Sequence, residues 1–173
     1  EYADVKVTKE ELNRQRYLYP LEAVGAGDST LAKAYERDAL TMIPTKSKLM
    51  PHAREVLEYL SGKYNLYILS NGFKELQRHK MRSSGIDEYF KKVVLSDDIG
   101  ILKPWPEIFH FALSTTQSEL NNSLMIGDSW ENDIVGAAGV GMHQVFYNLS
   151  GRTDLPFAPT YQITDLKDLF NFL

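Results

Sequence analysis

The feature of this 173-residue sequence that most limits its fold is a regular alternation of short apolar segments with helical segments after Pro51. Apolar and aromatic segments that alternate with amphipathic helical patterns are typical of βαβ units, in which helices cover a parallel sheet. The sequence therefore predicts an α/β fold with a parallel sheet. The predicted strands are residues 64–70, 92–96, 123–127, 143–147 and 161–163. The predicted helices between and after them are residues 53–61, 73–83, 104–116, 131–139 and a last one that includes Leu166, Leu169 and Phe170.

The first 48 residues differ from the rest, because their pattern predicts helices and no strand. Thr8 and Glu11 fit a capping box at the start of one helix, in which each side chain satisfies the other residue's backbone amide. Asp28 can cap a second helix. We therefore expect two domains, a small helical one over residues 1–48 and an α/β one over residues 49–173.

The composition excludes several classes of protein. Hydrophobic residues make up 43% of the chain, which is too many for a disordered protein. The 19 Lys and Arg against 23 Asp and Glu give a net charge of −4, whereas a nucleic-acid binder normally has a basic excess. No apolar run approaches the roughly 20 residues of a membrane span, and no signal peptide is visible. We expect a cytoplasmic protein with no nucleic-acid partner and no membrane partner.

Polar residues of types that bind ligands or take part in reactions follow two of the predicted strands. Ser70, Asn71 and Gly72 end one strand and open a helix, where a hydroxyl and backbone amides form an anion site. Lys103 follows the next strand, and Pro104 disfavours the helical conformation at Lys103, which limits where its ammonium can point. Ligands of open parallel sheets bind beyond the carboxyl ends of the strands, so we expect these groups to lie close together.

A pair of carboxylates follows the third predicted strand. Asp128 and Asp133 span the strand end and the first turn of a helix, and hard oxygen ligands at such a place suit Mg²⁺ with a bound phosphate. Each feature alone has an ordinary explanation: a turn, a solvated lysine or a helix cap. Together the three strand ends supply an anion cradle, a cation and a carboxylate pair, which converge on a phosphoryl group with its metal.

Three segments carry a resemblance to a known family. Residues 69–72 (Leu-Ser-Asn-Gly), 100–104 (Gly-Ile-Leu-Lys-Pro) and 127–137 (Gly-Asp-Ser-Trp-Glu-Asn-Asp-Ile-Val-Gly-Ala) resemble motifs two, three and four of the haloacid dehalogenase-like hydrolases. The similarity covers about residues 45–150, in the right order and spacing. The subgroup it resembles most is the pyrimidine-nucleotidase-like phosphatases. The resemblance implies a Rossmann-like core, and it implies that residues 1–48 are part of an α-helical cap.

The resemblance also implies a role for each candidate residue. The motif-two hydroxyl would bind the transferring phosphoryl group together with the two following backbone amides, and the lysine would neutralise charge on that group and on the nucleophile. The first aspartate would bind Mg²⁺ directly, and the second would support the metal through water. Such fixed groups stabilise a charged transition state. The implied residues are Ser70, Lys103 and Asp128 for catalysis, Ser70, Asn71, Gly72 and Lys103 for substrate binding, and Asp128 and Asp133 for the metal.

The nucleophile of the family is missing from the sequence. It belongs to an Asp-x-Asp motif on the first core strand, and no aspartate in this chain lies two positions from another. We expect the motif to lie upstream of Glu1 in a longer protein, and we expect this chain alone to be inactive. The family's first strand lies in the middle of the sheet, so the core of residues 49–173 would lack it. We therefore expect a complementing N-terminal segment or a second copy as a partner.

The activity that these features predict is that of a Mg²⁺-dependent phosphatase acting on small phosphate monoesters through an aspartyl-phosphate, with nucleoside monophosphates as the candidate substrates. Three alternatives remain. A haloacid dehalogenase shares the fold and the Ser-Asn-Gly turn but needs no metal and hence no carboxylate pair. A phosphosugar mutase needs a proton-relaying cap residue, and none stands out in residues 1–48. An inactive binding protein is supported only by the absent nucleophile.

Two neighbouring features carry structural expectations. Asp97 and Asp98 follow the second predicted strand, and we expect them to cap a loop. Trp130 lies inside the acidic segment, where it can either border the substrate entrance or cover the start of the helix.

Overall fold

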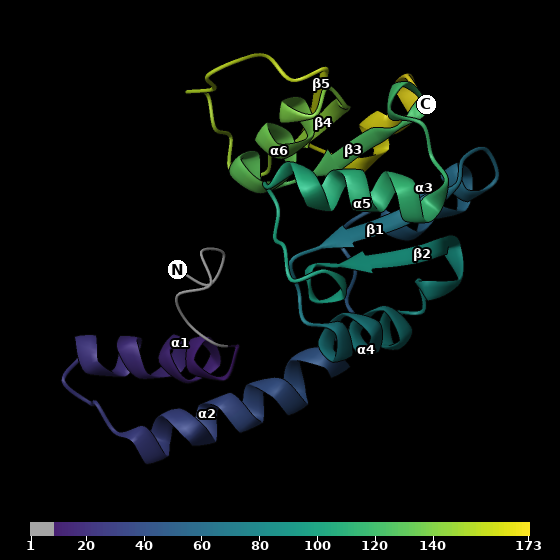
Figure 1. Cartoon of the computed structure of the whole chain (residues 1–173). Coiled ribbons are helices and arrows are strands. Elements are labelled where there is room, and N and C mark those ends of the chain that lie inside the picture. The colour runs from purple at the N-terminus through teal and green to yellow at the C-terminus, as the bar shows by residue number, and fades with distance from the viewer. Residues whose placement is uncertain (1–8) are drawn as a thin grey trace. The chain divides into compact units, whose positions relative to one another are not determined.

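The computed structural model describes residues 9–173, and the chain divides into two compact units. Of the described residues, 9–47 and 75–84 form the first unit, and 48–74 and 85–173 form the second. The fold is α/β with parallel sheets, as the sequence predicts (Figure 1). All five predicted strands are present.

The first unit is helical in the part of it that the structure describes. It contains α1 (Lys9–Ala23), α2 (Ser29–Met42) and all but the first residue of α4 (Lys74–Ser84). The Asp28 carboxylate accepts hydrogen bonds from the backbone amides of Thr30 and Leu31 at 2.7 and 3.3 Å, so it caps α2 as expected. Thr8, one half of the capping box expected before α1, lies outside the described residues. That this unit is part of a cap stays a prediction.

The second unit contains the strands and their covering helices. The strands are β1 (Leu66–Ser70), β2 (Phe90–Leu95), β3 (Leu124–Gly127), β4 (His143–Tyr147) and β5 (Tyr161–Ile163). The helices are α3 (Ala53–Ser61), α5 (Pro106–Thr116) and α6 (Gly136–Gly139), with a π-helical turn η5 (Trp130–Val135) before α6 and a 3₁₀ helix η6 (Leu166–Asn171) near the C-terminus.

The helix expected at residues 131–139 has a wide first turn. The backbone amides of Asp133 and Ile134 both donate to the carbonyl of Ser129, at 2.8 and 3.3 Å. The bond from Ile134 spans five residues, as in a π-helical turn, whereas an α-helical bond spans four. Regular α-helix begins only at Gly136. The wide turn brings the Asp133 side chain back toward the end of β3.

Within residues 9–173 the five strands form two parallel sheets, β1-β2 and β3-β4-β5, and no ladder joins β1 to β3. Every residue of β1 and β3 is only half-buried, whereas residues 144–146 of β4 are buried. Strands inside a parallel sheet are normally covered on both faces. β1 and β3 therefore each have one edge that is paired and one edge that this part of the chain leaves unpaired.

Both sheets nevertheless contribute to the same hydrophobic cores. Leu66 of β1 and Leu124 and Ile126 of β3 pack into one core with α3 and η6. Leu69 of β1 and Met125 of β3 pack into another, with α5 and α6. Because alternate strand residues point to opposite faces, the two cores lie on opposite sides of the strands. The ends of β1 and β3 are thus held near each other by shared packing.

Gly136 marks a close approach between α6 and the segments around it. A methyl group at this position would lie 2.6 Å from the ring of Phe109 and 3.0 Å from the Cα of Pro104. We expect Gly136→Ala to lower the free energy of unfolding by about 1–3 kcal/mol, as overpacking of a core does. Chemical denaturation followed by circular dichroism measures this change.

Gly139, three residues further along α6, provides the matched control for this prediction. A methyl group there would meet no atom within 4 Å. Gly139→Ala should leave stability unchanged or raise it by up to about 1 kcal/mol, because alanine loses less backbone freedom in a helix. Equal effects of the two substitutions would show that the contact with Phe109 is unimportant.

Candidate active site

The candidate site lies where β1 and β3 end. The arrowheads of β1, β2 and β3 lie on the same side of the second unit in Figure 1. Ser70 is the last residue of β1, and Gly127, the last residue of β3, leads directly to Asp128. The Ser70 hydroxyl oxygen accepts a hydrogen bond from the backbone amide of Gly72 at 3.0 Å, which closes a tight turn after the strand.

Lys103 connects the two strand ends. Its ammonium donates to the backbone carbonyl of Leu69 in β1 at 2.8 Å and to Oδ1 of Asp133 at 2.5 Å. The two charged side chains are 10% and 6% exposed, so the ion pair is nearly removed from water. A charged pair in such surroundings is stable only when its remaining hydrogen-bonding groups are also satisfied. The lysine therefore joins the end of β1 to the segment that follows β3.

The other oxygen of Asp133 is also engaged. Its Oδ2 accepts a hydrogen bond from the backbone amide of Ser129 at 3.0 Å. This arrangement requires a glycine at the end of β3, since a Cβ atom on Gly127 would overlap the Asp133 carboxyl group. Gly127 therefore permits the carboxylate to fold back against the strand end and reach Lys103.

The two carboxylates proposed for the metal differ in their surroundings. Asp128 is exposed, whereas both oxygens of Asp133 are held by Lys103 and Ser129. No cluster of three or more acidic, histidine or cysteine side chains able to hold a metal occurs among the described residues. Mg²⁺ is commonly held by one or two carboxylates together with waters and substrate phosphate, so one exposed carboxylate backed by a second one fits this ion.

The sequence-predicted residues are brought together to different degrees. Lys103 and Asp133 are in direct contact, and their contacts include Leu69 and Ser129, the chain neighbours of Ser70 and Asp128. The catalytic and metal-binding roles of these residues stay predictions. Sequence reasoning missed the carbonyl of Leu69 and the amide of Ser129, because backbone groups leave no signal in residue type.

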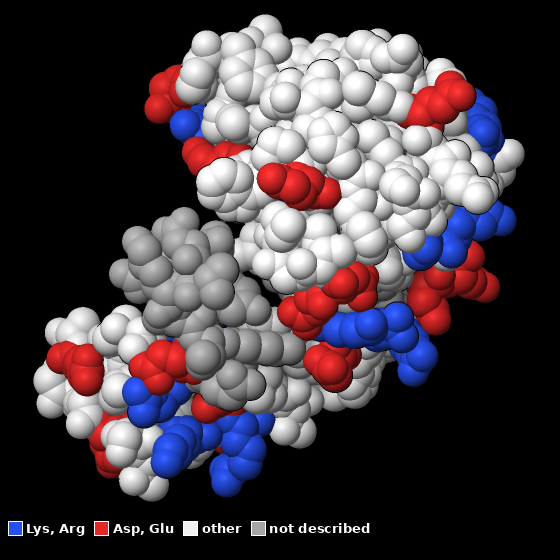
Figure 2. Space-filling view, viewed as in Figure 1, with Lys and Arg blue, Asp and Glu red and all other residues white. Residues whose placement is uncertain are grey.

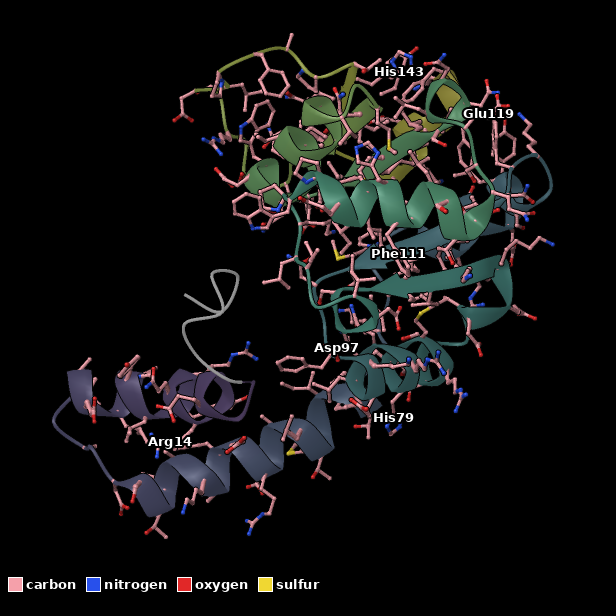
Figure 3. All side chains as sticks on the ribbon, viewed as in Figure 1. Arg14, His79, Asp97, Phe111, Glu119 and His143 are labelled. Atoms are coloured by element: carbon pink, nitrogen blue, oxygen red, sulfur yellow. The ribbon has the colours of Figure 1, made fainter. Side chains whose placement is uncertain are left out.

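Asp97 and Asp98 are capping residues, as expected. Asp97, labelled in Figure 3, accepts a hydrogen bond from the backbone amide of Lys74 at 3.1 Å, at the start of α4. Asp98 accepts one from the amide of Leu95 at 3.0 Å and pairs with the Lys74 ammonium at 3.1 Å. These bonds tie the loop after β2 to the turn that contains Ser70.

Trp130 belongs to the core. It is 3% exposed and packs against Phe146 and Phe157, with ring centroids 5.2 and 4.9 Å away. Of the two expectations for this residue, the structure supports packing over the start of the helix. Arg152 lies over the same ring at 5.7 Å and pairs with Glu131 at 2.6 Å. The hydrogen bond from Arg152 lowers the pKa of the Glu131 carboxyl below its ordinary value of 4.5.

Charge on the surface is mixed in sign. On the face drawn in Figure 2, Lys and Arg side chains lie among Asp and Glu side chains and form no continuous basic patch. None of the helices in residues 9–173 combines the length and the apolar character needed to cross a bilayer.

Comparison with known proteins identifies the class of protein to which this chain belongs. The family model of the haloacid dehalogenase-like hydrolases matches residues 4–141, and the chain belongs to this family. Pyrimidine nucleotidases among the relatives of this chain also support its resemblance to the pyrimidine-nucleotidase-like subgroup.

Individual relatives cover the whole chain. YfnB of Bacillus subtilis, described as a HAD-hydrolase, is 28% identical over 99% of this chain and 73% of its own length. The pyrimidine 5'-nucleotidase YjjG of Escherichia coli is 28% identical over 100% of this chain and 76% of its own. The magnesium-bound crystal structure of YfnB matches with a TM-score of 0.88. The match covers 99% of this chain and 75% of the YfnB chain. The structure of a 2-haloacid dehalogenase from Pseudomonas syringae matches with a TM-score of 0.69 and 27% sequence identity. The match covers 92% of this chain and 69% of the dehalogenase chain.

The buried ion pair yields a test of how the site is held. Asp133→Asn should lower the free energy of unfolding by about 3–5 kcal/mol, because it leaves the Lys103 ammonium buried without its counter-charge. Asp128→Asn is the matched control, and its effect should stay within about 0.5 kcal/mol because Asp128 is exposed. Urea denaturation of both variants measures the difference. Similar losses for the two would mean that the pair does not stabilise the fold.

The Glu131–Arg152 pair predicts a pH effect. Its contribution to folding is present above the ordinary pKa of a glutamate and is lost as the pH falls through the lowered pKa of Glu131 in the folded protein. In a Trp105→Phe background, Trp130 is the one remaining tryptophan. Arg152 lies over the ring of Trp130, and protonation of Glu131 removes the charge that holds Arg152 there. The fluorescence emission of Trp130 should therefore shift as the pH falls below 4.5.

Glu131→Gln gives the control for this titration. The variant should show part of the emission shift already at pH 7, and a smaller change on acidification, because its side chain carries no charge at any pH. Superimposable pH profiles for the two proteins would rule out a role for Glu131.

Proposed function

We propose that this chain supplies most of the active site of a Mg²⁺-dependent phosphatase that hydrolyses small phosphate monoesters. The observation that carries the proposal is the bridge made by Lys103, which contacts both the β1 end and Asp133. The bridge places a cation between the turn of Ser70 and the acidic segment of Asp128. Phosphatases and nucleotidases among the relatives support the same class of reaction.

Each group has a definite task in this proposal. The Ser70 hydroxyl and the backbone amide of Asn71 hold the phosphoryl oxygens, while the Gly72 amide, which donates to the Ser70 oxygen at 3.0 Å, orients that hydroxyl. The Lys103 ammonium stabilises the negative charge that develops on the transferring group, and it is held in place before the substrate arrives. Preorganised charges of this kind are most effective where water is excluded, and the lysine side chain is only 10% exposed.

Asp128 and Asp133 divide the work at the proposed metal position. The exposed Asp128 would bind Mg²⁺, and the buried Asp133 would keep Lys103 and the backbone of Ser129 in place beside it. When bound, the ion supplies positive charge that polarises the phosphoryl oxygens. The magnesium in the YfnB structure supports this choice of metal.

The nucleophile is the group that this chain does not supply. A carboxylate nucleophile attacks phosphorus, the P–O bond to the alcohol of the ester breaks and the alcohol leaves, and water then hydrolyses the aspartyl-phosphate. The sequence has no Asp-x-Asp motif to supply this carboxylate. We propose that an extended segment carrying this motif pairs with the unpaired edges of β1 and β3. This segment would be an N-terminal stretch of the same protein or part of a second copy. The chain alone would be inactive.

Substrate class and alternatives follow from the relatives and the site. Nucleoside monophosphates are our candidate substrates, supported by the pyrimidine 5'-nucleotidase YjjG. A dehalogenase, which also matches in fold, would not need Asp128, and a mutase would need a proton-relay residue, for which no candidate stands out in residues 1–48. We also propose a cytoplasmic location and no nucleic-acid or membrane partner.

Activity measurements test the proposal directly. A longer form that includes an Asp-x-Asp segment should hydrolyse p-nitrophenyl phosphate with Mg²⁺ and lose this activity in EDTA, whereas the printed chain alone should not turn over. Asp128→Asn should lower kcat of the longer form by about 100-fold or more, the scale of several kcal/mol of metal stabilisation. Retained turnover in EDTA would contradict the metal assignment, and halide release from a 2-haloacid would favour the dehalogenase.

Lys103→Ala separates charge stabilisation from simple binding in the same assay. Its kcat should fall by about 10²–10³-fold while KM changes much less, because the charge that the ammonium meets grows in the transition state. A variant with raised KM and normal kcat would instead show that Lys103 only binds substrate. A longer form that folds but never turns over would favour the inactive binding protein.

A further inference from the structure

The side chain of Asn71 makes a two-point contact that the proposed phosphoryl cradle does not explain. Its Nδ2 donates to the backbone carbonyl of Lys103 at 3.0 Å, and its Oδ1 accepts from the backbone amide of Lys103 at 2.8 Å. The orientation of the side-chain amide is fixed by chemistry, because the backbone N–H needs an acceptor and the carbonyl needs a donor. Asn71 therefore pairs with Lys103 as one peptide group pairs with another.

Lys103 is thus held at both ends by the residues on either side of Ser70. Asn71 fixes the lysine backbone, and the carbonyl of Leu69 fixes its ammonium at 2.8 Å. These three consecutive residues, Leu69, Ser70 and Asn71, form one short stretch of chain. The separation between the Ser70 hydroxyl and the Lys103 ammonium is therefore set by short-range bonds.

We propose that the side chain of Asn71 is a positioning residue that sets the place of the Lys103 ammonium relative to Ser70, an inference that rests on the phosphatase function proposed above. Its backbone amide contributes to the phosphoryl cradle, and its side chain acts on the substrate only through Lys103. Fixed geometry matters here because a displacement of about 1 Å in a reacting site can cost roughly 100-fold in rate.

A second asparagine in the chain makes the same contact elsewhere and provides a matched control. Asn148 donates from Nδ2 to the carbonyl of Arg152 at 2.8 Å and accepts from the Arg152 amide at 2.9 Å. Asn148 is buried and follows β4. Replacing either asparagine with alanine removes the same two bonds to a backbone, and in Asn148 also a longer one from the Ser150 hydroxyl at 3.4 Å, but only Asn71 acts on the lysine.

The kinetic test compares the two alanine variants in the longer, Asp-x-Asp-containing form. Asn71→Ala should lower kcat by about 10- to 100-fold with little change in KM, while Asn148→Ala should keep kcat within about twofold of the parent. If Asn71→Ala does not fold, the isosteric Asn71→Asp, which loses the bond to the Lys103 carbonyl, should show the same fall in kcat. An unchanged kcat in a folded Asn71 variant, or an equal fall in Asn148→Ala, would overturn the proposal.

A labelling test on the 173-residue chain distinguishes failure of this inference from failure of the proposed function. Lys103 is nearly buried, so its reaction with an amine-modifying reagent, followed by peptide mass spectrometry, should be slow in the parent. Asn71→Ala should raise the labelling rate of Lys103 severalfold, and Asn148→Ala should not. If Lys103 is labelled at the same rate in all three proteins, Asn71 does not position Lys103, whether or not the protein is a phosphatase. If labelling responds but no form hydrolyses phosphate esters, the phosphatase proposal alone fails.

Discussion

The nearly buried ion pair between Lys103 and Asp133 is the interaction on which the rest of the site depends. A lysine and an aspartate can remain charged away from water only if their other hydrogen-bonding positions are filled. Here the carbonyl of Leu69 fills one of these positions on the lysine, and the amide of Ser129 fills one on the aspartate. The electrostatic requirement of one pair thereby fixes the ends of two strands that share no ladder within residues 9–173.

Small residues make this pair sterically feasible. Gly127 leaves room for the Asp133 carboxylate at the end of β3, and Gly136 lets the ring of Phe109 and the backbone of Pro104 approach α6. The wide turn after Ser129 then carries Asp133 back toward the lysine. The backbone turn, the placement of glycine and the attraction of opposite charges therefore all favour the same position of the Asp133 carboxylate beside Lys103. This agreement between levels is expected where a sequence specifies a single local structure.

The sequence predicted most of the fold, because strand and helix patterns depend on local residue order. All five strands lie within about two residues of their expected ranges, and Asp28 caps α2 as expected. The π-helical turn at Trp130 was missed because it arises from a shared carbonyl acceptor, which residue type does not encode. The division of the strands into two sheets concerns long-range pairing, and only the absent Asp-x-Asp motif pointed to it.

The candidate site was predictable in its residue types but not in its connections. Lys103 and Asp133 were both identified, yet their direct contact was not foreseen, since Asp133 was expected beside a metal. The role of the Asn71 side chain could not be read from a Ser-Asn-Gly turn either, because many such turns use asparagine only for its backbone preferences. Thirty-two positions of chain separate Asn71 from its partner, and only folding reveals the bond.

The half-buried strands β1 and β3 have a consequence for the behaviour of this chain in solution. A strand edge with unused amides and carbonyls can recruit any extended polypeptide nearby, which makes it a starting point for aggregation. Such edges are also slow to be protected when the matching strand is distant in sequence or on another molecule. A chaperone that binds this polypeptide in a cell would therefore act chiefly by shielding the free edges of β1 and β3.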